Sequence, residues 1–460
     1  MLVHIEYVII NNVNNHTDVI GDVDLLHKSY QQLLTIFLPL YLKYKDRELI
    51  YIIAVVMMSL ETRMLHFYRR ARTSQGFPQS ADSQWFLDYA HSLMANFRIE
   101  LNMNDILYFG YNILLTVLLA IFKYPIVIIF IQAITTALSV ILVYQIANML
   151  FNRVTAVIAS IFYSQEWHIT IWSMYILSDS FFLSLLLLCI YSLLKFIESN
   201  QRKYGILFIG TSLYMLVFRP TGIVSMIFII IYILINLQRK VLIHFVKKYR
   251  LLLSSILIIA VASIVYIYTG DKLEPLFTSM QFNAKSVLYN IYANGWIYDT
   301  PSPQDHAFKV DYTINIWNSL IASFMINNWD NILILYGKRS IAFIGRWVWS
   351  TDLSTIPGVF KFMRDMLPSL FFMTGTIAAI RNRLFKKSSI VWLLILAVYL
   401  FCIVFFIDAV YRYKVPALPF IAIVCAYGVD RILNGAIIMI NKGWSSYYGN
   451  KNKLGRRSSF

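Results

Sequence analysis

Long runs of apolar residues, separated by short polar segments, dominate the pattern of this chain. A helix needs about 20 mainly apolar residues to cross a bilayer. By that rule the sequence predicts about ten membrane-spanning helices, at approximately 48–68, 125–150, 154–173, 181–197, 204–219, 221–237, 251–269, 361–380, 388–407 and 415–440. The expected fold class is therefore an all-α polytopic membrane protein.

The composition agrees with this prediction. Apolar residues make up 58% of the 460 residues and charged residues 14%, and the mean hydropathy of +0.61 lies far outside the range of soluble globular proteins. The net charge of +16 comes from 40 Lys and Arg against 24 Asp and Glu. These basic residues fall mainly in short loops between apolar runs, the positive-inside pattern of membrane proteins. We therefore expect no nucleic-acid partner.

The same charge pattern decides whether the apolar segment 106–122 crosses the membrane. Counting it as an eleventh span would move all later basic loops to the opposite face. We therefore predict a helix that lies along the outer surface. Two long outer-face loops follow from this topology, at 69–124 and 270–360, and long loops on a rigid scaffold usually carry function.

The remaining parts of the chain are predicted as follows. Residues 1–47 are a cytoplasmic or interfacial segment, 48–440 form the transmembrane domain, and 441–460 are a basic cytoplasmic tail.

Asp82 is an acidic residue at the start of a predicted helix in the first long loop. Asp82, Phe86 and Ala90 are spaced four residues apart, which places them on one helical face with the carboxylate at the positive end of the helix dipole. The plainer alternative is that Asp82 or Ser83 is simply the N-cap of a surface helix. Asp88 is a rival acid, ranked lower because it lies in the helix body.

A second acid, Asp179, lies in a short apolar hairpin at the outer end of a predicted span. Acids embedded in a membrane are costly and often functional, although Asp179 could also be a loop residue or a helix cap. Glu166 and His168 are weaker candidates, since either could satisfy a buried partner within the bundle.

Several cations oppose the positive-inside trend, and each of them needs an anionic partner. Arg219, Arg412 and the cluster at 69–72 are predicted on the outer face. An arginine fork suits a lipid phosphate, whereas pairing with Asp179, with Asp408 or with lipid headgroups is the alternative. In the second loop, Arg339 and Arg346 lie among aromatic and aliphatic residues, as in a helix near lipid phosphates.

Motifs for a soluble nucleotide-binding or hydrolase site are absent from the sequence. It contains no Gly-rich phosphate loop, no His-Glu-x-x-His motif and no Gly-x-Ser-x-Gly elbow. The three Cys all lie within apolar runs, without a metal or disulfide spacing. A sugar or other donor group is therefore expected to arrive on a lipid.

These residues together resemble the polytopic GT-C glycosyltransferases, which include protein mannosyltransferases and aminoarabinose transferases. The family has an acidic residue in its first outer loop, an aromatic residue about four positions on and a small residue about eight on, as at Asp82, Phe86 and Ala90. Later landmarks that resemble the family follow in the same order, at Tyr111, 144–156, 178–179, 219–222 and 412–419. The resemblance covers about 48–440.

The resemblance implies an inverting transfer from a polyprenyl-phosphate sugar to a lipid, glycan or protein acceptor. Asp82 would be the general base, and the expected substrate-binding residues are Asp179, Arg219, Arg412, Tyr413, Arg339 and Arg346. The reaction would take place at the outer face of a bacterial cytoplasmic membrane, in contact with membrane lipids. No cofactor is assigned. A divalent metal ion is left open, because many relatives have an acidic residue directly after the first Asp, where this chain has Ser83.

Two other functions fit parts of the pattern. A lipid-linked saccharide transporter or flippase would need polar residues distributed through the bundle, whereas interior runs such as 224–236 and 251–263 are nearly all apolar. An oligosaccharide polymerase or ligase would be an enzyme that uses a lipid pyrophosphate donor.

Overall fold

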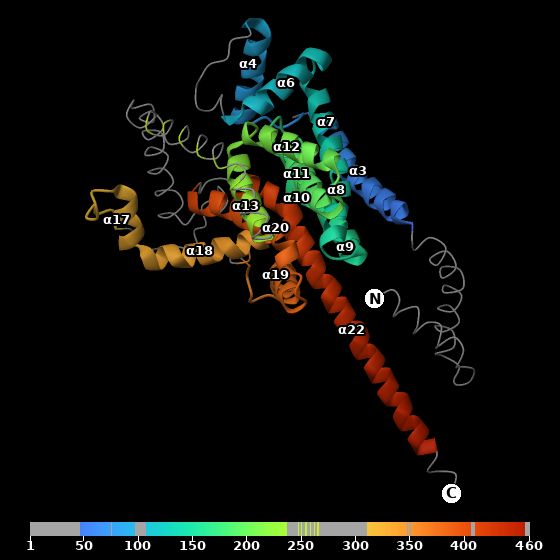
Figure 1. Cartoon of the computed structure of the whole chain (residues 1–460). Coiled ribbons are helices and arrows are strands. Elements are labelled where there is room, and N and C mark those ends of the chain that lie inside the picture. The colour runs from blue at the N-terminus through green and yellow to red at the C-terminus, as the bar shows by residue number, and fades with distance from the viewer. Residues whose placement is uncertain are drawn as a thin grey trace.

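The computed structural model describes residues 47–74, 76–96, 107–236, isolated positions between 247 and 265, 311–346, 348, 351–405 and 410–455. Over these residues the chain forms helices, turns and bends and no β-strand, which confirms the all-α expectation (Figure 1). Residues 270–310 of the second predicted outer loop fall outside the described residues, and so does the predicted span at 251–269 apart from isolated positions.

The helices follow one another along the chain in this order. The first half contains α3 (Glu48–Arg72), α4 (Ala81–Asn96), α6 (Phe109–Phe122), α7 (Pro125–Leu138), α8 (Val140–Leu150), α9 (Arg153–Gln165), α10 (Trp167–Trp172), α11 (Ser178–Ser199), α12 (Arg202–Leu216) and α13 (Pro220–Asn236). The second half contains α17 (Leu320–Asn327), α18 (Trp329–Ile344), α19 (Ile356–Arg381), α20 (Phe385–Tyr399), the π-helix η2 (Leu400–Phe405), α21 (Val410–Tyr413), the 3-10 turn η3 (Val415–Ala417) and α22 (Leu418–Gly455).

Five of these helical segments are long and apolar enough to cross a membrane. They are Glu48–Arg72, Pro125–Leu150, Ser178–Ser199, Phe385–Cys402 and Val415–Met439. Each one coincides with a span predicted from the sequence. The apolar helices α6, at the predicted surface helix 106–122, and α13, at the predicted span 221–237, are both shorter than a full span.

The predicted span at 154–173 is instead two helices. Glu166 lies between α9 and α10 in an extended conformation, and its side chain accepts a hydrogen bond from the backbone N–H of His168. The carboxylate of Glu166 also lies 2.8 Å from Nδ1 of the same histidine. The acid therefore ends one helix and caps the next, so these two weaker candidates pair with each other.

Polar side chains join the first helices to the bundle. On α3, Arg63 is fully buried and donates to the carbonyl oxygens of Tyr163 and Ser164 at the end of α9. Ser59, one turn earlier, donates to the carbonyl oxygen of Ala137 at 2.9 Å. Helix ends have carbonyl groups without intrahelical partners, and in an apolar surrounding such bonds hold helices together.

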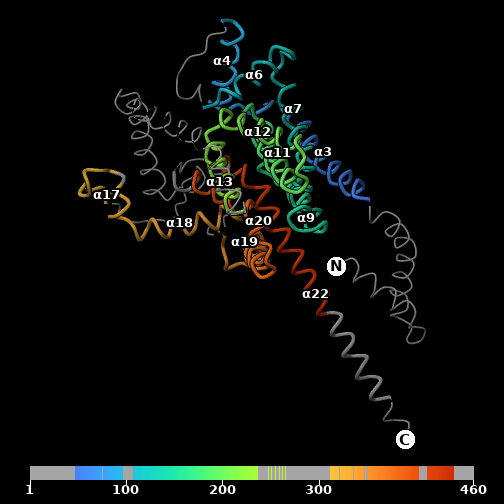
Figure 2. The backbone as a smooth tube through the Cα atoms, in the orientation of Figure 1, coloured from blue at the N-terminus to red at the C-terminus, as the bar shows by residue number. Residues whose placement is uncertain are grey.

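The second half of the bundle packs on the first through α22, which crosses α9 and α19 and continues beyond them (Figures 1 and 2). Gly375 on α19 and Gly428 on α22 let these two backbones approach so closely that a Cβ atom at either position would overlap a carbonyl oxygen of the other helix. Small residues commonly allow such contact between membrane helices.

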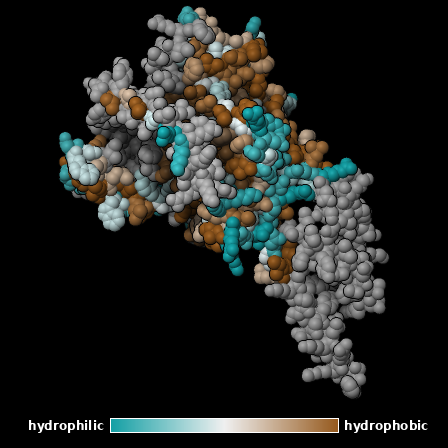
Figure 3. All heavy atoms as spheres, in the orientation of Figure 1, coloured by the Kyte–Doolittle hydropathy of each residue, from teal (hydrophilic) through white to brown (hydrophobic). Residues whose placement is uncertain are grey.

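Much of the molecular surface is apolar. Hydrophobic side chains cover large areas of the face in Figure 3, and the exposed set includes Ile206 at 70% and Leu213 at 62% on α12. An exposed apolar surface of this extent is expected of helices that face lipid.

Candidate active site

The candidate site begins at the N-terminus of α4, which carries Asp82. Ser80 is the residue that caps this helix, because its Oγ accepts the backbone N–H of Ser83 at 3.1 Å. Ser83 itself is buried, with its Oγ 3.0 Å from that of Ser80. The alternative that Asp82 or Ser83 is the N-cap is therefore wrong. The carboxylate of Asp82 does not cap the helix and instead binds a residue of another helix.

That contact is an ion pair with Arg412 on α21. Nη1 of Arg412 donates to Oδ2 of Asp82, whose side chain is 53% exposed. Nε of the same guanidinium donates to Oδ2 of Asp179 at 3.1 Å. One guanidinium therefore holds two carboxylates that come from different helices.

Asp179 is the buried centre of the site. It lies in the first turn of α11, where the helix dipole favours a negative charge, and its side chain has no exposed surface. Its second oxygen, Oδ1, accepts from Nη1 of Arg219. We call the four residues Asp82, Arg412, Asp179 and Arg219 the ion network.

Three of the residues in the ion network come from the ends of helices or from a short helix. Asp179 is the second residue of α11, Arg219 directly precedes α13, and Arg412 lies in the short helix α21. The network contains equal numbers of positive and negative groups, and burying charges is costly unless they are paired in this way. Arg219 is also almost fully buried, and its Nη2 makes no hydrogen bond within the described part of the chain.

Aromatic rings surround the two guanidinium groups. The ring centroid of Tyr413 is 5.4 Å from Cζ of Arg219 and 5.8 Å from Cζ of Arg412, and that of Trp172 is 5.9 Å from Cζ of Arg412. These distances allow cation–π attraction. Sequence reasoning named Tyr413 but missed Trp172, because nothing in the sequence places α10 beside α21.

Tyr108, directly before α6, was also missed. Its hydroxyl feels the charges of all four ion-network residues, although burial is the main cause that raises its pKa. Burial likewise raises the pKa of Tyr413 to about 12. Both phenols therefore remain neutral near pH 7 and can donate a hydrogen bond to an anionic ligand.

Lys414 directly follows Tyr413 in the sequence, and its side chain connects the site to the end of α18. Its Nζ donates to the carbonyl oxygens of Ala342 at 3.2 Å and Gly345 at 3.3 Å. Burial lowers the pKa of Lys414 from its ordinary value of 10.5 to about 8, with the charge of Glu166 partly opposing this change. The end of α18 is thus anchored next to the residues of the ion network.

The other candidates take different places. Arg346 is exposed and lies 3.4 Å from Asp365, whereas Arg339 is fully buried on α18. Asp88, the rival acid, is exposed and accepts a hydrogen bond from Gln84 at 2.8 Å. Asp408 lies outside the described residues. The structure therefore brings Asp82, Asp179, Arg219, Arg412 and Tyr413 together, and it pairs Arg346 elsewhere.

Among the residues that the structure describes, no three His, Cys, Asp or Glu side chains are grouped as metal ligands. Between the carboxylates of Asp82 and Asp179 lies the guanidinium of Arg412. The arrangement can therefore do two things with its own residues. It presents a half-exposed carboxylate, and next to it two arginines that can hold an anion.

Comparisons with known proteins show what the chain is similar to. Two structures of an oligosaccharyltransferase from Archaeoglobus fulgidus are similar to the chain at 14% sequence identity. The complex of its AglB with an inhibitory peptide and a dolichol-phosphate has a TM-score of 0.44 and covers 87% of this chain. The apo form has a TM-score of 0.43 and covers 86%.

The chain spans about half the length of these archaeal proteins, 52% in each case. No curated protein matches the chain. Residues 109–268 match the family model of the dolichyl-phosphate-mannose-protein mannosyltransferases. That range contains Asp179 and Arg219 of the ion network. Over residues 109–268 the resemblance to the GT-C glycosyltransferases is thereby confirmed.

Proposed function

We propose that the chain is an integral-membrane glycosyltransferase that moves a sugar from a polyprenyl-phosphate donor to an acceptor hydroxyl. The observation that carries this proposal is the ion network, in which Arg412 joins the half-exposed Asp82 to the buried pair of Asp179 and Arg219. A base and a site for an anionic leaving group therefore lie side by side, which is what transfer from a sugar phosphate requires.

Asp82 acts as the general base. Its Oδ2 is held by Arg412, while its Oδ1 makes no hydrogen bond within the described residues. Arg412 therefore orients the carboxylate and leaves one oxygen to accept the proton of an acceptor hydroxyl. Base catalysis of this kind is typically worth about 100- to 10,000-fold in rate.

Arg219 and Arg412 hold the phosphate of the donor. As the acceptor oxygen forms its bond to the anomeric carbon, the bond from that carbon to the phosphate oxygen breaks, and its electron pair remains on the phosphate. The proton of the acceptor moves to Asp82. Guanidinium groups already in position stabilise the charge that develops on the phosphate, and Nη2 of Arg219 has a hydrogen available for it.

The stereochemical outcome follows from a single displacement. In this displacement the acceptor oxygen attacks the anomeric carbon opposite the phosphate that the arginines hold, so the anomeric configuration inverts. Asp179 keeps both arginines in place from a buried position, while Tyr413, Arg339 and Arg346 are proposed to contact the substrates.

The topology proposed for this function keeps the site at the outer face of the cytoplasmic membrane. Residues 48–440 form the transferase domain with about ten spans, and the loops 69–124 and 270–360 cover the site. Residues 1–47 are a cytoplasmic or interfacial segment, and 441–460 are a basic cytoplasmic tail. The acceptor is a lipid, a glycan or a protein at that surface, and the membrane is bacterial.

The test is transfer of radiolabelled sugar from a panel of polyprenyl-phosphate sugars into cell-envelope material. Membranes would contain the wild-type chain or the Asp82→Asn variant. The proposal expects transfer from at least one donor by the wild type and none by the variant. Labelled lipid that instead crosses the bilayer equally in both preparations, with no transfer, would favour a transporter and refute the proposal.

A further inference from the structure

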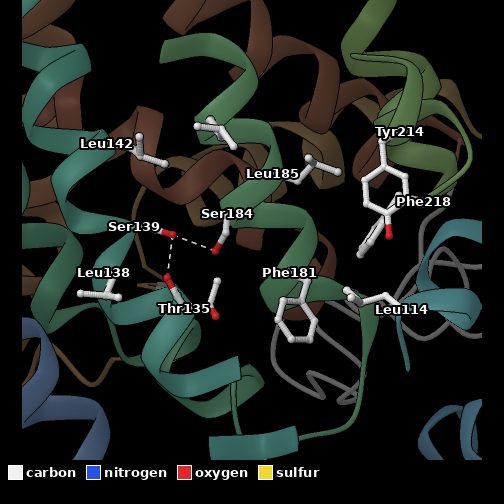
Figure 4. Close-up of a pocket in the computed structure, with 11 residues that line it drawn as sticks. Leu114, Thr135, Leu138, Ser139, Leu142, Phe181, Ser184, Leu185, Tyr214 and Phe218 are labelled. Atoms are coloured by element: carbon white, nitrogen blue, oxygen red, sulfur yellow. Dashed lines mark hydrogen bonds between the residues drawn. The ribbon is translucent and has the colours of Figure 1, made fainter. Parts of the chain in front are cut away.

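A cavity of about 400 Å³ lies between α6, α7, α8, α11 and α12 (Figure 4). Its walls are mainly leucine and phenylalanine side chains, among them Leu142, Phe181, Leu185 and Phe218. This volume lies within the roughly 300–1,000 Å³ of ordinary ligand pockets. It is too small for a helix of another protein, which is about 10–12 Å across and fills roughly 800 Å³ for every 10 Å of its length.

The hydroxyl groups in the cavity wall are largely engaged within the protein. Oγ of Ser184 donates to the carbonyl oxygen of Ser180 at 3.1 Å, and Oγ of Ser139 lies 2.8 Å from Oγ of Ser184 (Figure 4). The hydroxyl of Tyr214 donates to the carbonyl oxygen of Gly110 at 2.9 Å. A polar ligand would therefore find few partners here, and the lining suits a hydrocarbon.

The wall of the cavity includes the middle of a candidate membrane span, and the cavity is open to its surroundings. Residues 135–142 of its wall come from the middle of the candidate span Pro125–Leu150. Leu138 in that wall is 42% exposed. A lipid chain in the bilayer can therefore enter from the side, without passing through water.

The cavity is also next to the ion network. Phe218 in its wall directly precedes Arg219, and Phe181 follows Asp179 by two positions on α11. Phe181 and Phe218 thus line the apolar cavity, while Asp179 and Arg219, close to them in sequence, form an ion pair. A molecule with a phosphate at the arginines and an attached hydrocarbon chain matches both sides of this boundary.

We infer that this cavity holds the first part of the prenyl chain of the lipid-linked donor, the part nearest the phosphate. The inference rests on the proposed function, because that function supplies the phosphate at Arg219 and Arg412. In this arrangement the cavity wall formed by α7, α8 and α11 orients the prenyl chain of the donor. The sugar attached to the phosphate is thereby directed toward Asp82.

The expected effect is one of position more than of affinity. In a bilayer the prenyl chain is already surrounded by hydrocarbon, which is as apolar as leucine. Seating it in the cavity therefore gains little hydrophobic free energy, but it removes freedom that would misplace the sugar. Filling the cavity should lower transfer from long-chain donors by about threefold to tenfold.

The test compares a long-chain polyprenyl-phosphate sugar with a dimethylallyl-phosphate sugar in proteoliposomes, because a single five-carbon unit leaves most of the cavity empty. Leu185→Trp fills the cavity from α11 and should lower the ratio of kcat/KM for the long donor to that for the short donor by about threefold to tenfold. Ile206→Trp is the matched control, because it adds similar volume at a lipid-facing position of α12 that is not part of the wall. It should leave the ratio unchanged.

An unchanged ratio in Leu185→Trp, with transfer intact, would overturn the inference and leave the proposed function standing. If the wild type transfers sugar from none of the donors, the proposed function is refuted. The assignment of the cavity to the prenyl chain of the donor is then refuted as well.

A second measurement does not depend on the folding of a variant. A photoreactive farnesyl phosphate should label wild-type peptides that contain 135–142 or 181–188, and unlabelled long-chain polyprenyl phosphate should compete. Label found only on other helices would contradict the inference. So would competition by phosphatidylglycerol as strong as that by the polyprenyl phosphate, since the cavity would then bind ordinary acyl chains.

Discussion

Arg412 donates hydrogen bonds to Asp82, 330 positions earlier in the sequence, and to Asp179, 233 positions earlier. The guanidinium can do this because its planar fork presents several N–H groups in fixed directions. A carboxylate near the surface is thereby tied to a buried charge pair. The orientation of Asp82 thus depends on a residue from the opposite end of the chain.

Replacing Arg412 by Lys distinguishes the effect of the positive charge at this position from the effect of the fixed hydrogen-bond geometry of the guanidinium. The ammonium of Arg412→Lys keeps the positive charge but cannot reach both carboxylates with the same fixed fork. We expect a decrease in kcat of roughly 100-fold, comparable to the loss of one preorganised donor at other enzymes, while the protein still folds. The measurement is steady-state transfer in proteoliposomes. Activity close to that of the wild type would show that the bridging geometry is unimportant.

Removing the charge of Asp179 should destabilise the protein. Asp179→Asn would leave Arg219 buried without its ionised partner, a change that typically costs about 3–5 kcal/mol. The melting temperature of the detergent-solubilised protein should therefore fall clearly. The double variant Asp179→Asn with Arg219→Met should recover part of the loss, because it removes the unpaired charge as well. A single variant that melts like the wild type would contradict this account of the ion network.

The buried Lys414 predicts an alkaline rise in stability. Below pH about 8 this lysine is protonated in both the folded and the unfolded state, so the cost of burying its charge is fully present. Between pH about 8 and 10.5 only the unfolded state keeps the proton, and stability increases with pH.

The variant Lys414→Met should remove that increase. The tyrosines at the site do not obscure it, since the pKa of Tyr413 is about 12. The check is the melting temperature of both proteins across this pH window. Parallel curves would mean that the pKa of Lys414 is not lowered in the folded protein.

The contact between α19 and α22 depends on glycine. A methyl group at Gly375 would overlap the carbonyl oxygen of Val424, and overpacking of this kind typically costs about 1–3 kcal/mol. We expect Gly375→Ala to lower the melting temperature. Gly435→Ala on the same helix as Val424 is the control, since no atom lies within 4 Å of the added Cβ. Equal melting temperatures for the two variants would show that the helices are not in this close contact.

The hydrophobic pattern located the helices well, because a membrane helix must be apolar along its whole length. All five candidate spans of the structure fall on predicted ones. The pattern failed at 154–173, where Glu166 ends one helix and caps the next. A carboxylate inside an apolar run does not by itself reveal whether it interrupts the helix, since that depends on the hydrogen bond it forms.

The candidate site was predictable only in part. Asp82, Asp179, Arg219 and Arg412 were each conspicuous because a charge at the apolar outer face needs a partner. Which residues become partners was not predictable, because Arg412 meets Asp82 only through the packing of helices far apart in sequence. The same limit explains why Arg346, equally conspicuous in the sequence, pairs with Asp365 instead.

The most direct test of the central claim is the turnover of Asp82→Asn in proteoliposomes, measured beside that of Asp88→Asn and together with binding of the donor. Asp82→Asn breaks a half-exposed ion pair, which costs about 1 kcal/mol or less in stability, so the protein should fold. We expect kcat of this variant to fall by about 100- to 10,000-fold. Donor affinity should be at least as high as in the wild type, because Arg412 is released toward the phosphate. Asp88→Asn should behave like the wild type, since Asp88 is exposed and its hydrogen bond to Gln84 lies outside the ion network. An Asp82→Asn variant that turns over at the wild-type rate would contradict the account.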